Sequence, residues 1–170
     1  MHAKTFNESD IKAAFLYYFL YFITWPDQEV DNKSDPLKFC SFDAGPVTQT
    51  LESILASPKA INTAVEIHII ENPAEATECN YVYVDSKNSA STALVISATS
   101  GKSILTVSDN DGFANAGGMI ELTRISNKIK VQINLEVLSL HRLKASSKLL
   151  KLAEIVTRSN VRGGIDVPEE

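Results

Sequence analysis

Short apolar runs that alternate with segments of helical spacing are the feature that most constrains the fold of this chain. Four such runs predict strands, at residues 37–42, 64–70, 81–84 and 104–108. Pro46 and the apolar residues spaced helically after it predict a helix behind the first run, and residues 91–98 predict a weaker helix ahead of the last. Near-continuous apolar strands separated by helices are typical of a mainly parallel sheet. We therefore expect an α/β domain.

The C-terminal third of the chain predicts a different arrangement. Residues 119–124 and 128–134 flank the turn residues Ser126 and Asn127, which indicates an antiparallel β-hairpin. A final helix is predicted over about residues 147–158 from its apolar stripe of Leu149, Leu152, Ala153 and Val156.

The expected organisation is a single domain over residues 1–160, with a mostly parallel sheet and a C-terminal antiparallel hairpin. Gly163, Gly164 and Pro168 predict a flexible tail over residues 161–170.

The N-terminal segment predicts an unusually apolar helix. Thr5 and Glu8 have the spacing of a capping box, so the helix is expected to begin near residue 6. Pro26 is expected to stop it by forcing Trp25 out of the helical region. A polar loop is expected over 27–35. Most of the helix circumference is apolar, with Ile11, Phe15, Tyr17, Tyr18, Phe19, Tyr21 and Phe22. Such a helix is buried or forms half of an interface.

This apolar stretch is neither a transmembrane span nor a targeting signal. Its core, residues 13–23, is shorter than the about 20 residues that a spanning helix needs. Glu8 and Asp10 precede it, whereas a signal peptide begins with a basic region. If the protein is exported, its signal peptide has been removed.

Charge is distributed unevenly along the chain. The net charge of −5 is the sum of −7 over residues 1–140, +5 over 141–162 and −3 over the last eight residues. A basic surface over the whole protein, as nucleic-acid binding requires, is therefore excluded. The final helix is bracketed by Arg142, Lys144, Lys148, Lys151, Arg158 and Arg162. These residues form a solvated face, or they dock on an acidic partner or on anionic lipid headgroups.

Motifs of catalysis and cofactor binding are missing from the sequence. It contains no GxGxxG, no GxxxxGK[ST], no GxSxG and no HExxH. His2, His68 and His141 lie far apart, and the Asp109–Gly112 segment fits a turn better than a calcium loop. We therefore predict no catalytic residue, no metal site and no cofactor.

The glycine-rich segment 112–118 places Phe113 just after a buried strand. Open α/β sheets bind ligands at the carboxyl ends of their strands, so Phe113 is a candidate for a pocket wall. Alternatively, Phe113 fills the core while the glycines turn the chain.

The two cysteines, Cys40 and Cys79, are 39 positions apart. This spacing excludes a CxxC redox site and a four-ligand zinc site. An exported chain is expected to pair them, whereas a cytosolic chain would keep them reduced as small buried side chains. Spacing alone leaves both possibilities open.

The order of several short motifs resembles the YfiR-like family of periplasmic regulatory proteins, from about residue 10 to residue 157. No single motif is specific, but their order and spacing together are. Where many relatives carry a His after the second cysteine, this chain has Asn80, and a second cysteine pair of some members is missing. The residues that carry the resemblance are Lys12–Tyr17, Trp25–Pro26, Phe39–Cys40, Cys79, Tyr81–Val84, Leu105–Asp109, Gly112–Ala114, Gly117–Ile120, Ile133–Leu135 and Ser147–Ala153.

This resemblance implies an exported protein with a three-layer α/β/α sandwich that forms homodimers in the periplasm. It also implies that Cys40 and Cys79 form a disulfide bond. The founding type of the family represses a membrane-bound diguanylate cyclase by binding its periplasmic sensor region, which lowers cyclic-di-GMP output and biofilm formation. No catalysis is implied.

Our leading hypothesis is therefore a non-enzymatic periplasmic regulator that binds the periplasmic domain of an inner-membrane diguanylate cyclase. The alternative is a periplasmic sensor module that binds a small molecule. The candidate residues for a partner or ligand surface are Phe113, Tyr17, Tyr21, Trp25, Arg142 and Lys148.

Overall fold

A computed structural model describes residues 7–26, 36–42, 44–60 and 64–156 of the chain. Its main element is a seven-stranded sheet in the order β3-β2-β4-β5-β6-β7-β9, with a separate two-stranded pair of β1 and β8. The strands are β1 (Ile23–Thr24), β2 (Leu37–Ser41), β3 (Val65–Ile69), β4 (Tyr81–Val84), β5 (Leu105–Ser108), β6 (Ile120–Ile125), β7 (Lys128–Asn134), β8 (Lys144–Ala145) and β9 (Glu154–Val156).

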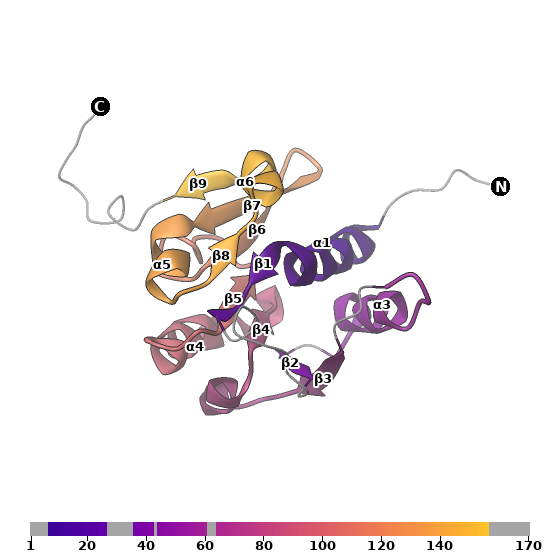
Figure 1. Ribbon diagram of the computed structural model, residues 1–170, viewed down its shortest axis with the longest axis horizontal. Coiled ribbons are helices and arrows are strands. Elements are labelled where there is room, and N and C mark those ends of the chain that lie inside the picture. The colour runs from indigo at the N-terminus through magenta and orange to yellow at the C-terminus, as the bar shows by residue number, and fades with distance from the viewer. Residues whose placement is uncertain (1–6, 27–35, 43, 61–63, 157–170) are drawn as a thin grey trace.

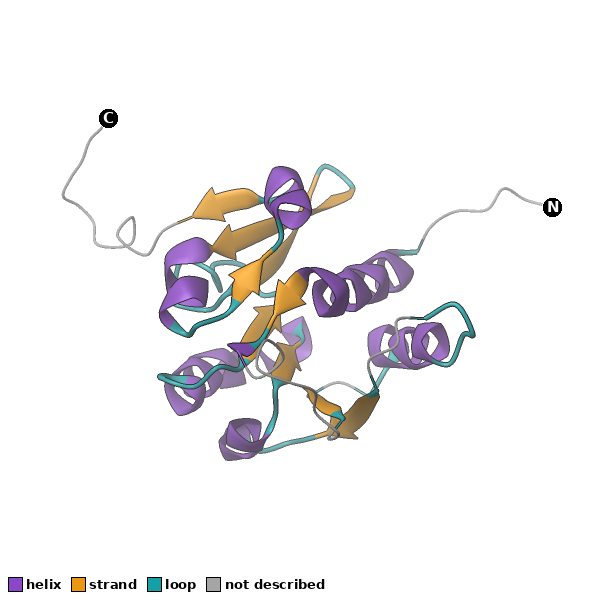
Figure 2. Ribbon diagram, viewed as in Figure 1, coloured by secondary structure: helices purple, strands orange, loops and turns teal. Residues whose placement is uncertain are grey.

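Helices lie on both sides of this sheet (Figures 1 and 2). The α-helices are α1 (Glu8–Phe22), α3 (Pro46–Leu55), α4 (Thr92–Thr99), α5 (Leu135–Leu140) and α6 (Ser147–Leu152), and the 3₁₀ helices are η1 (Pro73–Glu78) and η2 (Ser86–Ser91). The predicted α/β class is confirmed. Strands β3, β2, β4, β5 and β6 are parallel to one another, and β7 is antiparallel to β6.

Successive side chains along the central strands point to opposite faces of the sheet, so the chain has one hydrophobic core on each face. Phe39, Tyr81 and Leu105 point into the larger core, which also contains buried residues of α1, α3 and α6. Their neighbours Cys40 and Val82 belong to the second core, together with residues of η1 and α4. Because strands buried on both faces need apolar side chains at every position, they appear in the sequence as continuous apolar runs.

The first helix is shorter than predicted at both ends. Asn7 is its N-cap and accepts a hydrogen bond from the Asp10 backbone N–H, so the helix begins at Glu8 rather than near residue 6. Thr5 and the expected polar loop at 27–35 lie outside the described residues. The helix ends at Phe22 rather than just before Trp25, because Ile23 and Thr24 pair with β8.

The hairpin is confirmed, with β6 and β7 paired antiparallel over six residue pairs. Its turn residues Ser126 and Asn127 both have positive φ, of 49° and 66°. Two left-handed residues produce the backbone twist that a two-residue hairpin turn requires.

The predicted final helix over 147–158 is wrong in its second half. Helix α6 ends at Leu152, Ala153 is extended, and the chain enters β9, which pairs parallel with β7. The backbone of Glu154–Val156 gains sheet hydrogen bonds from this pairing, and the apolar stripe that predicted a helix is shared between the two elements. Helix α5 was not predicted, and the expected tail at 161–170 lies outside the described residues.

Candidate functional site

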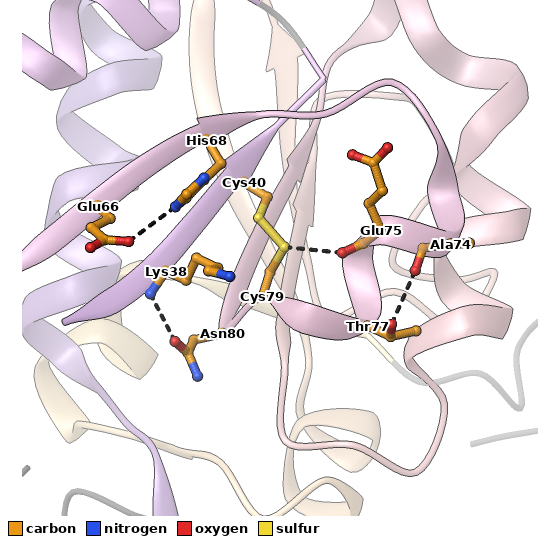
Figure 3. The surroundings of a disulfide bond; sticks show 9 residues. All are labelled: Lys38, Cys40, Glu66, His68, Ala74, Glu75, Thr77, Cys79 and Asn80. Atoms are coloured by element: carbon orange, nitrogen blue, oxygen red, sulfur yellow. Dashed lines mark hydrogen bonds and ion pairs between the residues drawn. A yellow bond between two sulfur atoms is a disulfide. The ribbon is translucent and has the colours of Figure 1, made fainter. Parts of the chain in front are cut away.

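A disulfide bond joins Cys40 on β2 to Cys79, which lies two residues before β4 begins (Figure 3). The two Cα atoms lie 6.1 Å apart, and the residues are 1% and 4% exposed. The pairing implied by the family resemblance is thereby confirmed. The bond closes a loop that contains α3, β3 and η1, so it fixes a long crossover connection to the centre of the sheet.

Asn80, the residue that follows Cys79, bonds to the strand beside the disulfide. Its side-chain Oδ1 accepts a hydrogen bond from the Lys38 backbone N–H at 2.8 Å, and its backbone N–H donates to the Lys38 carbonyl at 2.9 Å (Figure 3). The Asn80 carbonyl accepts a third bond from the indole N–H of Trp25 at 2.9 Å. The sequence marked Asn80 only as a departure from the family, whereas the structure gives it a role in joining β1, β2 and β4.

Aromatic side chains line the accessible side of α1. Tyr18 and Tyr21 are 47% and 64% exposed, and Tyr17 is half-buried. The ring of Tyr18 packs against two others: its centroid lies 6.0 Å from that of Tyr17 and 6.3 Å from that of Phe22. We call Tyr17, Tyr18 and Tyr21 the α1 aromatic face.

Two of the predicted surface residues are buried. Trp25 is 4% exposed, with its ring against Tyr81. Phe113 is 2% exposed, and a Cβ added at Gly118 would lie 2.2 Å from its ring. Both side chains therefore pack inside the chain, and for Phe113 this position agrees with the core-filling alternative.

Buried polar side chains hold the loop between β5 and β6. Glu121, 3% exposed, accepts hydrogen bonds from the backbone N–H groups of Gly112 and Ala114 at 3.1 and 3.0 Å. Asn134 donates from Nδ2 to the Ala114 carbonyl at 2.8 Å. These residues were not predicted, although a lone glutamate within the apolar segment 119–122 is a signal that could have identified Glu121.

A partly buried ion pair connects α1 to the end of β5. Lys12 Nζ lies 2.6 Å from Asp109 Oδ2 and 2.8 Å from Glu8 Oε2, and the Tyr83 hydroxyl donates to Asp109 at 3.1 Å. Burial disfavours the charged form of Lys12, but its bonds to Asp109 and Glu8 outweigh that effect and raise its pKa. The hydrogen bond from Lys12 is the main cause of a lowered pKa at Glu8. The sequence placed Asp109 in a turn and predicted no ion pair.

The basic side chains after α5 lie beside the C-terminal end of α1. Arg142, Lys144, Lys148 and Lys151 are all exposed. Lys144 pairs with Thr24 in the β1–β8 ladder, and the Ser146 backbone N–H donates to the Phe22 carbonyl at 2.9 Å. The structure therefore brings Tyr17, Tyr21, Arg142 and Lys148 onto adjoining segments, while Trp25 and Phe113 stay in the interior.

Histidines occupy separate positions. His68 Nε2 lies 3.1 Å from Glu66 on the exposed strand β3, and His141 Nε2 accepts a hydrogen bond from the Gly101 backbone N–H. Within the ranges that the structure describes, no three His, Cys, Asp or Glu side chains are grouped as a metal ion would require. None of the helices in these ranges has the length and apolar character needed to span a bilayer.

Comparison with known proteins identifies a matching family and a solved structure of similar fold. A family model described as YfiR/HmsC-like matches residues 9–154. Among solved structures, an ABC domain from Streptococcus pneumonia in complex with L-Trp aligns with a TM-score of 0.61 and 11% identity over 85% of this chain. The chain spans 60% of that protein's length, and at 11% identity the likeness concerns the fold alone. Curated proteins give no significant match.

Proposed function

The chain belongs to the YfiR/HmsC-like family, and from this premise we propose that it is a non-enzymatic periplasmic regulator. It binds the periplasmic sensor region of a membrane-bound diguanylate cyclase and represses it, which lowers cyclic-di-GMP signalling and biofilm formation. The family match over residues 9–154 supports this proposal, because it includes every described strand except the last two residues of β9.

The observation that carries the proposal is the buried Cys40–Cys79 bond. Structural disulfides form and persist in oxidising compartments such as the bacterial periplasm and are rare in the cytosol. Both sulfur atoms lie within the second core, so the pair serves folding rather than surface thiol chemistry. A periplasmic location places the protein in the compartment where a cyclase's sensor region is accessible.

The α1 aromatic face supports a protein-binding role. Tyr and Trp are enriched at the energetic centres of interfaces, since they bury a large rigid area at a small cost in side-chain entropy. Tyr21 is 64% exposed on the last turn of α1, and this turn leads into β1, the strand that pairs with β8. We assign the cyclase-binding surface to Tyr18 and Tyr21, and we expect the family's homodimer to leave this face accessible.

A pull-down tests this assignment. The oxidised chain is mixed with the purified periplasmic segment of the cyclase encoded beside it, and binding is measured for Tyr21→Ser against the matched control Leu94→Ser. Leu94 is similarly exposed, at 58%, but lies on α4 on the other face of the sheet. We expect Tyr21→Ser to weaken binding by about ten-fold or more and Leu94→Ser to leave it unchanged.

Two results would count against the proposal. If the wild-type chain fails to bind the cyclase segment in both its oxidised and reduced forms, the regulatory function is contradicted. If both variants bind as the wild type does, the function stands and the surface assignment fails.

The small-molecule alternative has weaker support. It places Phe113 in a pocket wall, whereas the ring fills the space beside Gly118. Thermal-shift screening checks this alternative, because a ligand specific for the folded chain raises its melting temperature.

A further inference from the structure

Two segments of this chain carry charge of opposite sign. Every charged residue from 137 to 153 is basic, namely Arg142, Lys144, Lys148 and Lys151, and the exposed Glu136 and Glu154 flank this segment. Every charged residue from 64 to 85 is acidic, and four of these carboxylates are exposed, Glu66, Glu71, Glu75 and Glu78. The acidic segment begins with the edge strand β3 and runs through η1 to the interior strand β4, whereas the basic segment leads into β9, the edge strand at the other end of the sheet (Figure 1).

The basic end also exposes large apolar side chains. Leu140, at the end of α5, is 68% exposed, and Leu152, at the end of α6, is 69% exposed. Among the large apolar and aromatic side chains of the described ranges, Tyr21 at 64% and Leu94 at 58% come next. We call Leu140, Arg142, Lys144, Lys148, Lys151 and Leu152 the basic surface.

Exposed leucines among lysines and arginines are the composition of a surface that rests on an anionic bilayer. The basic side chains attract the headgroups, and the leucines gain free energy when they enter the boundary between headgroups and acyl chains. We infer that the basic surface docks on a bilayer of anionic phospholipid.

Charge separation favours a bilayer over an acidic protein as the occupant. The basic residues are spread over the turn after α5, strand β8 and helix α6. Basic residues spread in this way suit a plane of diffuse negative charge, whereas a compact acidic segment of a protein would contact only some of them. The exposed glutamates of the acidic segment are repelled by the same plane, so the bilayer binds the molecule in one orientation.

This docking holds the α1 aromatic face close to the membrane. The backbone hydrogen bond from Ser146, the N-cap of α6, to the Phe22 carbonyl joins the start of α6 to the end of α1. A protein held in this way meets a membrane-anchored partner on a surface rather than in solution. The inference does not rest on the proposed function, since lipid binding is measured without any cyclase.

Vesicle sedimentation tests the inference on the full oxidised chain. The probes are vesicles of phosphatidylglycerol and phosphatidylcholine, vesicles of phosphatidylcholine alone, and soluble poly-glutamate. Lys148→Gln/Lys151→Gln is compared with Lys59→Gln/Lys87→Gln, which removes the same charge from exposed lysines elsewhere. Circular dichroism establishes that each variant is folded.

Each basic residue near an anionic membrane strengthens binding by about five-fold. We therefore expect the α6 double variant to bind the phosphatidylglycerol vesicles about 25-fold more weakly, and the control double variant to remain within about two-fold of the wild type. Salt at 1 M reduces the Debye length to about 3 Å and should abolish binding. Leu152→Ser should weaken binding by about five-fold, whereas the control Leu94→Ser should not change it.

Three results would overturn the inference. The first is equal binding to vesicles with and without phosphatidylglycerol, or no binding to either. The second is an equal loss in the two lysine double variants, which would indicate that only net charge matters. The third is binding to poly-glutamate with the same dependence on Lys148 and Lys151 but no binding to vesicles, which would indicate an acidic protein partner instead.

Discussion

Removing the disulfide bond should destabilise the fold without destroying it. In the chain-entropy relation for cross-links, a closed loop with a sequence separation of 39 corresponds to about 4 kcal/mol of stabilisation at 25 °C. The native state loses little else in Cys40→Ala/Cys79→Ala, because β2 keeps its parallel pairing with both β3 and β4. We therefore expect the double variant to fold, with a free energy of unfolding about 4 kcal/mol below that of the oxidised wild type.

Urea unfolding at neutral pH measures this difference, with the reduced wild type as a second comparison. In a chain of this length, 4 kcal/mol corresponds to a fall in melting temperature of about 8–16 °C. The reduced wild type and the double alanine variant should agree within about 1 kcal/mol, since both lack the cross-link. A loss below about 1 kcal/mol in both would refute the reasoning, because it would mean that the unfolded chain gains little freedom when the loop opens.

Three further predictions concern the interior. Lys12→Met removes the ion-pair partner of the partly buried Asp109 carboxylate and should lower the free energy of unfolding by about 2 kcal/mol in urea denaturation; a loss under about 0.5 kcal/mol would show that the pair contributes no more than an exposed one. Burial raises the pKa of Tyr81 well above its usual value, so the stability that its neutral form contributes is complete below about pH 10 and is lost as pH rises further. Unfolding curves at alkaline pH should show this fall, and Tyr81→Phe should flatten it; an unchanged slope in the variant would assign the fall to other groups. Gly118→Ala forces a Cβ against the ring of Phe113 and should lower stability by about 2 kcal/mol in thermal unfolding, and adding Phe113→Leu should recover part of the loss if the clash is the cause.

Burial on both faces explains why the central strands could be predicted from sequence. Tyr81–Val84 is apolar at every position, Leu37–Ser41 and Leu105–Ser108 combine apolar residues with small hydroxyl side chains, and each segment is a largely buried strand. The family and the disulfide pairing followed from the order of short motifs. In contrast, the end of α6 could not be predicted, because Glu154–Val156 has a stripe that suits a helix and becomes a strand only beside β7.

Candidate surface residues were the hardest to predict. Tyr21 and Trp25 are both aromatic residues near the end of one apolar segment, yet one is 64% exposed and the other 4% exposed. The difference arises because the indole of Trp25 donates to the carbonyl of Asn80, a residue distant in sequence. No local pattern contains that contact.

The sequence by itself determined the α/β class, the hairpin, the family and the uneven distribution of charge, because each depends on local pattern or on motif order. Only the tertiary structure decided that Phe113 is enclosed, that Lys12 pairs with Asp109 across 97 positions, and that the acidic segment begins with one edge strand of the sheet while the basic segment leads into the other. The physical reason is that burial, ion pairing and surface charge depend on which distant segments become neighbours. Strand order and loop closure set those neighbours, and neither can be read from the spacing of residues along the chain.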